Sequence, residues 1–209
     1  MTGARRVLVA TTNPGKVREL ASILAGLPVE LVGLAELDGA PGLSSPPEVE
    51  ETGDTFMANA LLKARTYAAW SGLGALADDS GLEVDVLGGA PGVYSARYAG
   101  PGAGDAANLA KLLAAIAGVP EAERTARFRC AAVLADPDGR TWRAEAAWEG
   151  RLLDRPRGSG GFGYDPVFVP DGWERTSAEV SAATKNAASH RARAFAALRP
   201  AVEAWAAGA

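Results

Sequence analysis

Two adjacent aspartates, Asp78 and Asp79, stand at the end of a short apolar run and are followed by Ser80 and Gly81. Carboxylates are rarely buried unless they are paired, protonated or bound to a metal. The stretch is therefore either an acidic turn in water or a place where the chain holds a cation. Adjacent strand residues point to opposite faces, so the two aspartates are not expected to face one ion. We predict Asp79 as the working carboxylate, because Ser80 and Gly81 leave the backbone beside it accessible.

A second acidic pair, Glu50 and Glu51, lies at the end of a long polar loop, just before a helical pattern over residues 55–70. By itself such a pair only favours the start of a helix through the helix dipole. Carboxylates from separate segments are, however, what Mg2+ binds, usually together with substrate phosphates. The two acidic pairs together predict a magnesium site formed by Asp79 with Glu50 or Glu51.

Phosphate-binding groups are predicted at residues 11–16, where a strand-like run leads into a helix capped by Asn13. Backbone N–H groups at a helix start bind phosphate, and Lys16 adds a positive charge. The spacing is not that of a Walker A loop, and the alternative is a capped helix with a surface lysine. Further along, Asn59 and Lys63 are four residues apart on one helix face and could reach a ligand together.

A glycine-rich stretch, residues 158–166, contains two aromatic residues, Phe162 and Tyr164. Aromatic rings most often pack into the core. The glycines next to them let a ligand approach the backbone closely, and one ring would then be available to stack on a flat base. The stretch therefore predicts either core packing or a base-binding loop.

Three basic residues, Lys185, His190 and Arg191, fall in an alanine-rich helix expected from about residue 182 to residue 207. On one continuous helix, Lys185 and His190 would lie about 140° apart. They converge only if Lys185 precedes the helix or lies in its first turn. The alternative is a basic helix start in contact with water.

The whole chain has the composition of an ordinary globular protein, with 209 residues, 48% of them hydrophobic and 22% charged. This length suits a single domain, residues 1–209. The net charge of −4 provides no basic surface for a nucleic-acid polymer. No apolar run is long enough for a membrane span or a signal peptide. The one cysteine, Cys130, is expected in the core, and we predict a cytoplasmic protein.

Strands and helices alternate along the chain, which predicts an α/β fold with a mixed sheet. Apolar runs rich in β-branched residues predict strands, and capped periodic segments predict helices. A loop as long as residues 38–54 is usually functional or disordered. In chain order, the expected elements are a strand at 5–11, a helix at 13–26, a strand at 29–34, a helix at 55–70, a strand at 74–78, a helix opening at Asp105, a hairpin at 126–150 that turns at 136–139, a loop from 155 that runs into a short strand ending at 169, and a helix at 182–207.

Five stretches of this sequence, in order, closely resemble the inosine triphosphate pyrophosphatase family, the XTP/dITP diphosphatases that remove non-standard purine nucleotides. They span nearly the whole chain, and the third is the most specific. The five stretches are ATTNPGKVREL (10–20), EETGDTFMANALLKA (50–64), ADDSGLEVDVLGGAPGVYSARYAG (77–100), GGFGYDPVF (160–168) and KNAASHRARA (185–194).

The resemblance implies an elongated α/β fold in which helices flank a central mixed β-sheet, with two lobes, an active site in the cleft between them, and usually a homodimer. It implies Mg2+-dependent cleavage of ITP, dITP or XTP to the monophosphate and pyrophosphate, which cleanses the nucleotide pool. Asp79 is implied as general base and metal ligand, with Glu50 or Glu51 assisting the metal. The implied substrate-binding residues are Thr11, Thr12, Asn13, Pro14, Gly15, Lys16, Asn59, Lys63, Ser80, Phe162, Gly163, Tyr164, Asp165, Lys185, His190 and Arg191.

Selection of the base has a simple physical basis. A 6-keto purine offers an acceptor at O6 where adenine offers a donor, so His190, Arg191 or backbone N–H groups can select it. Two other functions fit part of the pattern. One is a pyrophosphatase of related fold that acts on modified pyrimidine nucleotides. The other is a nucleotide sensor without hydrolysis, which would have lost the carboxylates that this chain keeps.

Overall fold

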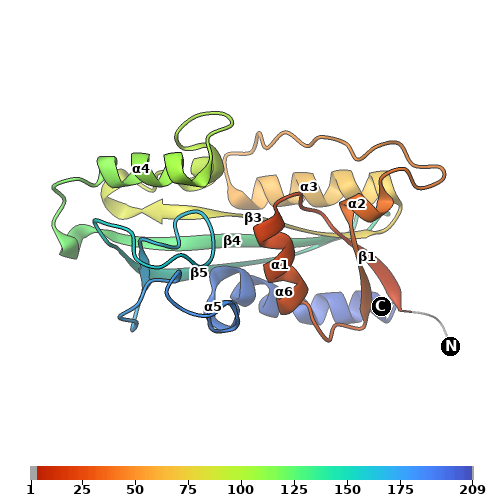
Figure 1. The fold of residues 1–209 in the computed structure, drawn as a ribbon. Helices are drawn as coiled ribbons and strands as arrows, with labels where there is room; N and C mark the ends of the chain where they lie inside the picture. Colours follow the sequence, from red (N-terminus) through yellow and green to blue (C-terminus); the bar gives the residue numbers. More distant parts are fainter. Residues whose placement is uncertain (1–3, 209) are drawn as a thin grey trace. The chain divides into compact units, whose positions relative to one another are not determined.

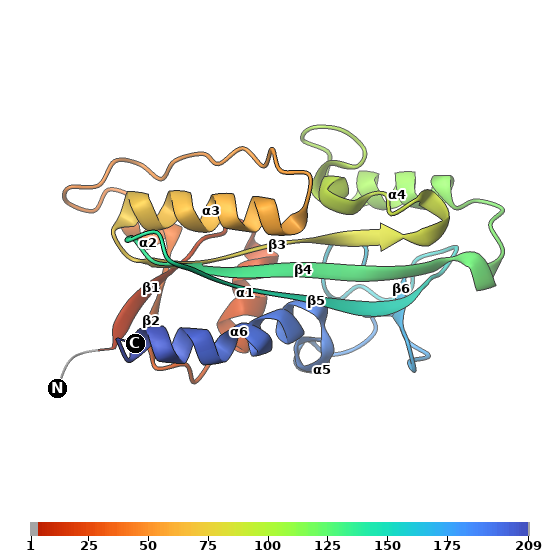
Figure 2. The same cartoon turned by 180° about the vertical axis from the view of Figure 1, so that it is seen from behind.

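Six strands form one mixed β-sheet in the computed structural model, which describes residues 4–208. The strands are β1 (Arg5–Val9), β2 (Val29–Gly33), β3 (Gly74–Val84), β4 (Thr125–Ala135), β5 (Thr141–Leu152) and β6 (Phe168–Pro170). They lie in the order β2-β1-β3-β4-β5-β6 (Figures 1 and 2). β1 pairs in parallel with β2 and β3, whereas β5 and β6 are antiparallel. The predicted mixed α/β fold is therefore confirmed.

The helices begin largely where the sequence places capping side chains. They are α1 (Pro14–Ile23), α2 (Leu34–Leu37), α3 (Phe56–Ser71), α4 (Asp105–Ala115), α5 (Ala182–Ala188) and α6 (His190–Ala206), with 3-10 turns at Asp85–Leu87, Gly92–Arg97 and Glu121–Glu123. The side chains of Asn13, Thr55 and Ser181 accept backbone N–H groups at the starts of α1, α3 and α5. Within residues 4–208, none of these helices has the length and apolar character that crossing a membrane requires.

By their contacts, the residues divide into two compact units. The first comprises the chain up to Asp79, residues 131–145 and the chain from Arg193 onward. The second comprises Ser80–Cys130 and Ala146–Ala192. Strands β3, β4 and β5 each contribute residues to both units.

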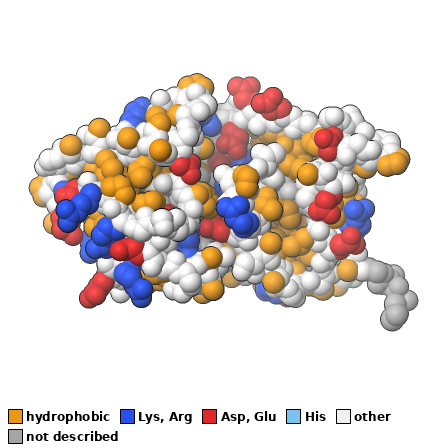
Figure 3. Space-filling model, viewed as in Figure 1, with side chains coloured by type: hydrophobic (Ala, Val, Ile, Leu, Met, Phe, Trp, Pro, Cys, Tyr) orange, Lys and Arg blue, Asp and Glu red, His pale blue; other side chains and the backbone are white. Residues whose placement is uncertain are grey.

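In the first unit, α3 lies along one face of the strands, and α1 and α6 lie along the other (Figures 1 and 2). Leu8, Leu76, Leu134 and Trp205 are fully buried in its core. The loop of residues 38–54 runs back above α3. Acidic side chains gather on the surface over this loop in the space-filling view (Figure 3).

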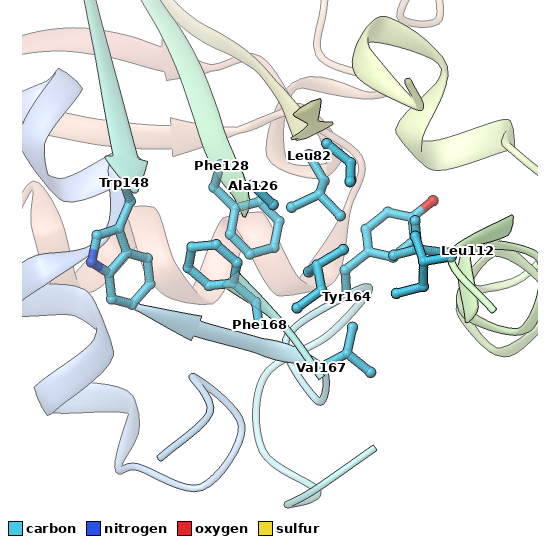
Figure 4. Packing of buried hydrophobic residues seen from close by; sticks show 11 residues of the cluster. Leu82, Leu112, Ala126, Phe128, Trp148, Tyr164, Val167 and Phe168 are labelled. Carbon is cyan, nitrogen blue, oxygen red and sulfur yellow. The ribbon is translucent and has the colours of Figure 1, made fainter. Parts of the chain in front are cut away.

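In the second unit, aromatic and branched side chains from the strands and the loop before β6 form one buried cluster (Figure 4). The rings of Phe128 and Phe168 meet edge to face, with centroids 4.7 Å apart. Trp148 packs beside Phe168 with a centroid distance of 5.5 Å. Offset and edge-to-face contacts of this kind suit the charge distribution of aromatic rings. Cys130 is also buried, as predicted.

Strand β3 is longer than the sequence pattern suggests. The prediction that a strand ends at residue 78 is wrong, because β3 continues through Asp78 and Asp79 to Val84. Both aspartates are buried. Buried carboxylates are tolerated when they are paired, and each of these two contacts a lysine, so the strand can pass through them.

The predicted continuous helix over residues 182–207 is also wrong, because it is two helices. Ser189 between α5 and α6 is extended, with φ −65° and ψ 159°. Its side-chain oxygen accepts the N–H of Ala192 and so caps α6. Lys185 therefore lies on α5 and His190 begins α6, and the angular separation calculated for one continuous helix does not apply. A smaller difference is that Leu34 begins α2 instead of ending β2.

Candidate functional site

The two aspartates of β3 contact lysines from opposite faces of the strand. Asp79 Oδ2 accepts a hydrogen bond from Asn59 Nδ2 at 3.1 Å, and Asp79 Oδ1 lies 3.4 Å from Lys63 Nζ. Asp78 Oδ2 lies 3.1 Å from Lys16 Nζ. Asn59 and Lys63 belong to α3 and Lys16 to α1, which cover opposite faces of the strands (Figures 1 and 2). The structure therefore shows the alternation that the sequence predicts for adjacent strand residues.

Lys63 links β3 to the long loop before α3. Its Nζ lies 2.5 Å from Glu51 Oε1 as well as near Asp79. Burial works against a charged lysine, but the surrounding carboxylates of Asp79, Glu51 and Asp78 outweigh it and hold the pKa of Lys63 above its ordinary value. Lys63 is therefore a fixed positive charge at neutral pH. Glu50, the other member of the acidic pair, is exposed.

Burial raises the pKa of Asp79. The positive charges of Lys63 and Lys16 act in the opposite direction, and the negative charge of Glu51 adds to the rise. A carboxylate with a raised pKa is a stronger base than an ordinary aspartate, which favours proton abstraction from water. We call the group formed by these side chains the carboxylate–lysine cluster. Its members are Lys16, Glu51, Asn59, Lys63, Asp78 and Asp79.

In the segment that leads into α1, side chains accept hydrogen bonds from the first backbone N–H groups of the helix. Asn13 Oδ1 accepts from the N–H of Gly15 at 2.8 Å and of Lys16 at 3.1 Å. Thr11 Oγ1 accepts from the N–H of Asn13. The exposed residues of this segment are Thr12, Asn13 and Pro14. Since the cap occupies two of the N–H groups, we expect a phosphate here to depend mainly on the Lys16 ammonium and the threonine hydroxyls.

In the second unit, Asp165 gathers three donors. Its side chain accepts from Lys185 Nζ at 2.5 Å, Ser177 Oγ at 2.8 Å and the N–H of Phe162 at 2.9 Å. Asp165 and Lys185 are both buried. Gly161 precedes this contact in a left-handed conformation, and a side chain there would overlap the Asp165 carboxylate. The loop is thus held to α5 by a buried ion pair whose carboxylate accepts two further hydrogen bonds.

The ring of Phe162 lies beside two cations. Lys185 Nζ is 4.7 Å and Arg191 Cζ is 5.9 Å from the ring centroid. Arg191 is buried and donates from Nη2 to Ser80 Oγ at 2.8 Å. His190 stacks on Phe128 with a centroid distance of 4.8 Å and an interplanar angle of 13°. We call this group the aromatic–cation cluster, and its members are Ser80, Phe162, Asp165, Lys185, His190 and Arg191.

Tyr164 lies apart from this cluster, because its ring packs in the buried core (Figure 4). Its hydroxyl donates to the carbonyl of Ser95 at 2.8 Å, and burial raises its pKa. The neighbouring Gly163 N–H donates to Asp105 Oδ2. Of the two aromatic residues of this loop, Phe162 is therefore the one whose ring stands among the cations.

The structure brings together most of the residues predicted from the sequence, in two groups. Ser177 and Ser95, which support Asp165 and Tyr164, are absent from the predicted set. Ser95 lies within the third stretch that carries the resemblance (77–100), but the sequence does not indicate that its carbonyl accepts from Tyr164; Ser177 lies outside all five stretches. The pairing of Asp78 with Lys16 is likewise a contact between segments 62 residues apart in the chain, which no periodicity reveals.

The carboxylates of Glu51 and Asp79 are of the kind that a magnesium ion prefers as ligands. Among residues 4–208, no three His, Cys, Asp or Glu side chains are arranged to hold a metal by themselves. Glu51 and Asp79 both contact the ammonium group of Lys63. Mg2+ is usually bound by one or two carboxylates, with substrate phosphates and water completing its octahedron. Two carboxylates without a third protein ligand are consistent with that mode of binding.

The fold defines a mixed α/β protein, with the carboxylate–lysine cluster in its first compact unit and the aromatic–cation cluster in its second. A model of the Ham1 family matches residues 7–201, and the chain belongs to this family. The chain is 53% identical over 199 residues to a protein from Streptomyces coelicolor named dITP/XTP pyrophosphatase, covering 94% of this chain and 96% of that one. A protein of the same name from Geobacter sulfurreducens is 52% identical over 194 residues, with 93% and 94% covered.

Solved structures agree with this membership. A HAM1 protein from Coxiella burnetii is 38% identical, with a TM-score of 0.83 and with 95% of this chain and 98% of that chain covered. A structure from Mycobacterium abscessus, described as a nucleoside-triphosphatase or dITP/XTP pyrophosphatase, is 45% identical with a TM-score of 0.73, covering 94% and 99%. The resemblance inferred from the five sequence stretches is therefore confirmed.

Proposed function

We propose that this protein hydrolyses non-standard purine nucleoside triphosphates, namely ITP, dITP and XTP, to the monophosphate and pyrophosphate. The observation that carries the proposal is Asp79, a buried carboxylate held by Asn59 and Lys63 in a chain about half identical to proteins named dITP/XTP pyrophosphatase. Its activity would remove such nucleotides from the pool of a cytoplasm, where we expect the protein to act as a homodimer.

The reaction that we propose is attack of water on the α-phosphorus. Asp79 accepts the proton of the attacking water, an O–P bond forms, and the bond from the α-phosphorus to the bridging oxygen breaks so that pyrophosphate leaves. Lys63 holds Asp79 and Glu51 in place, and Lys16 supplies a positive charge to the phosphates. Mg2+, when bound, would neutralise phosphate charge and increase the electrophilicity of phosphorus, with Asp79 and Glu51 as its protein ligands.

The aromatic–cation cluster is the proposed base site. Phe162 offers a ring for stacking, and Lys185 and Arg191 offer donors to the O6 acceptor of a 6-keto purine. Ser80 and Asp165 hold these two cations in position. His190 is stacked on Phe128 and adds a polar ring at the start of α6.

A panel of nucleoside triphosphates assayed for pyrophosphate release in Mg2+ tests the proposal. We expect dITP, ITP and XTP to be hydrolysed with kcat/KM values far above those of ATP and GTP. Comparable values for dITP and ATP would contradict the proposed base selection. Preference for a modified pyrimidine triphosphate would identify the related pyrimidine enzyme, and nucleotide binding without pyrophosphate release would identify a sensor.

A further inference from the structure

One face of α3 binds the long loop before it through a row of four side chains. Asn59, Lys63, Tyr67 and Trp70 are spaced by four, four and three residues, so they lie within about 80° of one another around the helix axis. Each contacts a different point of residues 44–53, which we call the strap. The strap lies along α3 in both ribbon views (Figures 1 and 2).

The four contacts run in order, with the strap antiparallel to the helix. Asn59 Oδ1 accepts the N–H of Gly53 at 2.7 Å, and Lys63 Nζ donates to Glu51 Oε1 at 2.5 Å. The Tyr67 hydroxyl donates to the Pro47 carbonyl at 3.1 Å, and Trp70 Nε1 donates to the Ser44 carbonyl at 3.1 Å. Two of the acceptors are backbone carbonyls of a segment without helix or strand. Backbone groups of such a loop need partners from elsewhere, and the side chains of α3 provide them.

The backbone before and after Glu51 is hydrogen-bonded to side chains of α3. On its C-terminal side, the N–H of Gly53 is bonded to Asn59, and a side chain at Gly53 would come within 2.7 Å of Asn59 Oδ1. On its N-terminal side, Tyr67 holds Pro47. Asn59 also donates to Asp79, so the helix that holds the strap is the same one that holds the predicted general base.

Tyr67 and Trp70 pack against each other and also donate hydrogen bonds to the strap. Tyr67 is buried, and its ring meets Trp70 edge to face at 6.3 Å. Burial raises the pKa of Tyr67, so its hydroxyl stays protonated and remains a donor at neutral pH. Neither residue touches Asp79 in the contacts above, and neither belongs to the motifs that carry the resemblance to the family.

We propose that Tyr67 and Trp70 are positioning residues that hold the strap on α3 and thereby place the Glu51 carboxylate next to Lys63 and Asp79. This inference rests on the proposed function, in which Glu51 assists a magnesium ion. A carboxylate on a long loop binds a metal only in the fraction of molecules where the loop is in place, and the apparent affinity falls by that fraction. The strap contacts raise that fraction before metal and nucleotide arrive.

The test uses Tyr67→Phe and the double variant Tyr67→Phe/Trp70→Phe, which remove one or both donors to the strap and keep aromatic rings in place. Amide hydrogen exchange of the free protein over residues 44–53 should accelerate about threefold in the single variant and tenfold or more in the double variant. The magnesium concentration for half-maximal pyrophosphate release from dITP should rise in the same order, with kcat at saturating magnesium within about twofold of the unchanged protein.

Ser71→Ala is the matched control. It removes the 2.7 Å bond from the Ser71 hydroxyl to the Tyr67 carbonyl and the 3.2 Å bond from the Leu73 N–H to that hydroxyl, and neither bond involves the strap. Its strap exchange and magnesium requirement should match those of the unchanged protein. If the double variant shows neither faster exchange nor a higher magnesium requirement, or only one of the two, the proposal is overturned.

Failure of the proposed function gives a different result. An unchanged protein that releases no pyrophosphate from any triphosphate would remove the hydrolase proposal. The exchange measurement and calorimetric titration of the free protein with MgCl2 would still apply. Faster exchange together with weaker magnesium binding in the double variant would then support the strap, and an unchanged result would overturn it.

Discussion

The two polar clusters differ in the sign of their charge and in how they are built. In the carboxylate–lysine cluster, the carboxylates of Glu51, Asp78 and Asp79 contact the ammonium groups of Lys16 and Lys63, and Asp79 also accepts a hydrogen bond from Asn59. Three carboxylates beside two ammonium groups suit a divalent cation, and burial, together with the negative charge of Glu51, raises the pKa of Asp79.

In the aromatic–cation cluster, one carboxylate, Asp165, faces the cations of Lys185 and Arg191 beside the Phe162 ring. Here the surplus is positive and the donors are fixed by Asp165 and Ser80. Such a group suits an uncharged, flat ligand that carries hydrogen-bond acceptors. Under the proposed function, the reaction is assigned to the first cluster and recognition of the base to the second. Variants of the first cluster should therefore lower kcat, and variants of the second should raise KM and weaken base selection.

The largest effect is expected from Asp79→Asn. Asparagine keeps the size of the side chain and one acceptor oxygen but cannot accept a proton or attract Mg2+ as strongly. Loss of a general base costs about 10² to 10⁴ in rate, and a weakened metal site adds to this. Pyrophosphate release from dITP should fall by at least this factor, while calorimetry should still detect nucleotide binding through Lys16 and the aromatic–cation cluster.

Asp78→Asn provides the comparison for that variant. Asp78 is on the other face of β3 and contacts Lys16, so its loss should lower activity less, through a displaced Lys16, and should also lower stability. Near-normal turnover of Asp79→Asn, or a larger loss of kcat in Asp78→Asn, would show that the wrong carboxylate has been chosen.

A smaller effect, on KM more than on kcat, is expected from Arg191→Lys. Arg191 donates to Ser80 and lies over the Phe162 ring, and the lysine ammonium cannot reproduce the planar guanidinium. We expect kcat/KM for dITP to fall about 10- to 100-fold, mainly through KM, and the ratio of dITP to dATP turnover to fall with it. Steady-state kinetics on both nucleotides measure this.

Arg193→Lys, at an exposed position of α6, is the matched control and should keep the kinetics of the unchanged protein. If Arg191→Lys lowers kcat while leaving KM and the nucleotide ratio unchanged, the division of roles between the clusters fails.

Tyr164→Phe should affect stability more than kinetics. It removes the hydrogen bond to the Ser95 carbonyl but keeps the ring in the core. A buried hydrogen bond contributes about 1 kcal/mol, which corresponds to a fall in Tm of about 2–4 °C for a protein of this size. Thermal unfolding measures this. Tyr94→Phe, at a ring that is 57% exposed, should leave Tm unchanged. A several-fold rise in KM without a change in Tm would place Tyr164 in the base site instead.

The smallest effect is expected from Asp85→Asn, in a charged contact outside both clusters. Hydrogen bonds from Thr125 and Arg127 lower the pKa of Asp85 below its ordinary value. A lowered pKa means that the ionised form stabilises the folded state above the pKa of the unfolded chain, about 3.9, and that this contribution is lost as pH falls through the folded value. Because Asp85 is largely exposed, the variant should lose at most about 1 kcal/mol of unfolding free energy at pH 7.

Urea titrations of this variant and the unchanged protein at pH 7 and pH 3 measure the difference. The difference should be largest at pH 7 and smaller at pH 3, with equal kcat and KM at pH 7. A difference that grows as the solution becomes acidic would contradict the assigned direction of the pKa shift.

The sequence alone determined the parts of this protein that depend on neighbouring residues. Asn13 caps α1, Thr55 caps α3, and the hairpin turns at residues 136–139, because capping and turn preferences act over three or four residues. The placement of Asn59 and Lys63 on one helix face also follows from a local spacing, and both contact Asp79. Strand alternation predicts that Asp78 and Asp79 face opposite sides, and the structure shows this. The choice of Asp79 rests on the accessible backbone at Ser80 and Gly81, and its catalytic role stays a prediction.

Only the tertiary structure decided which of these groups meet. Nothing in the local pattern indicates that β3 passes through Asp78 and Asp79. Their burial depends on distant lysines: Lys16 lies 62 residues before Asp78, and Lys63 lies 16 residues before Asp79. The break at Ser189 and the burial of Tyr164 in place of Phe162 are decided in the same way, by packing against distant segments. Local preference favours conformations by tenths of a kcal/mol per residue, whereas burial of a charge or an aromatic ring changes the free energy by several, so the long-range contacts determine the outcome.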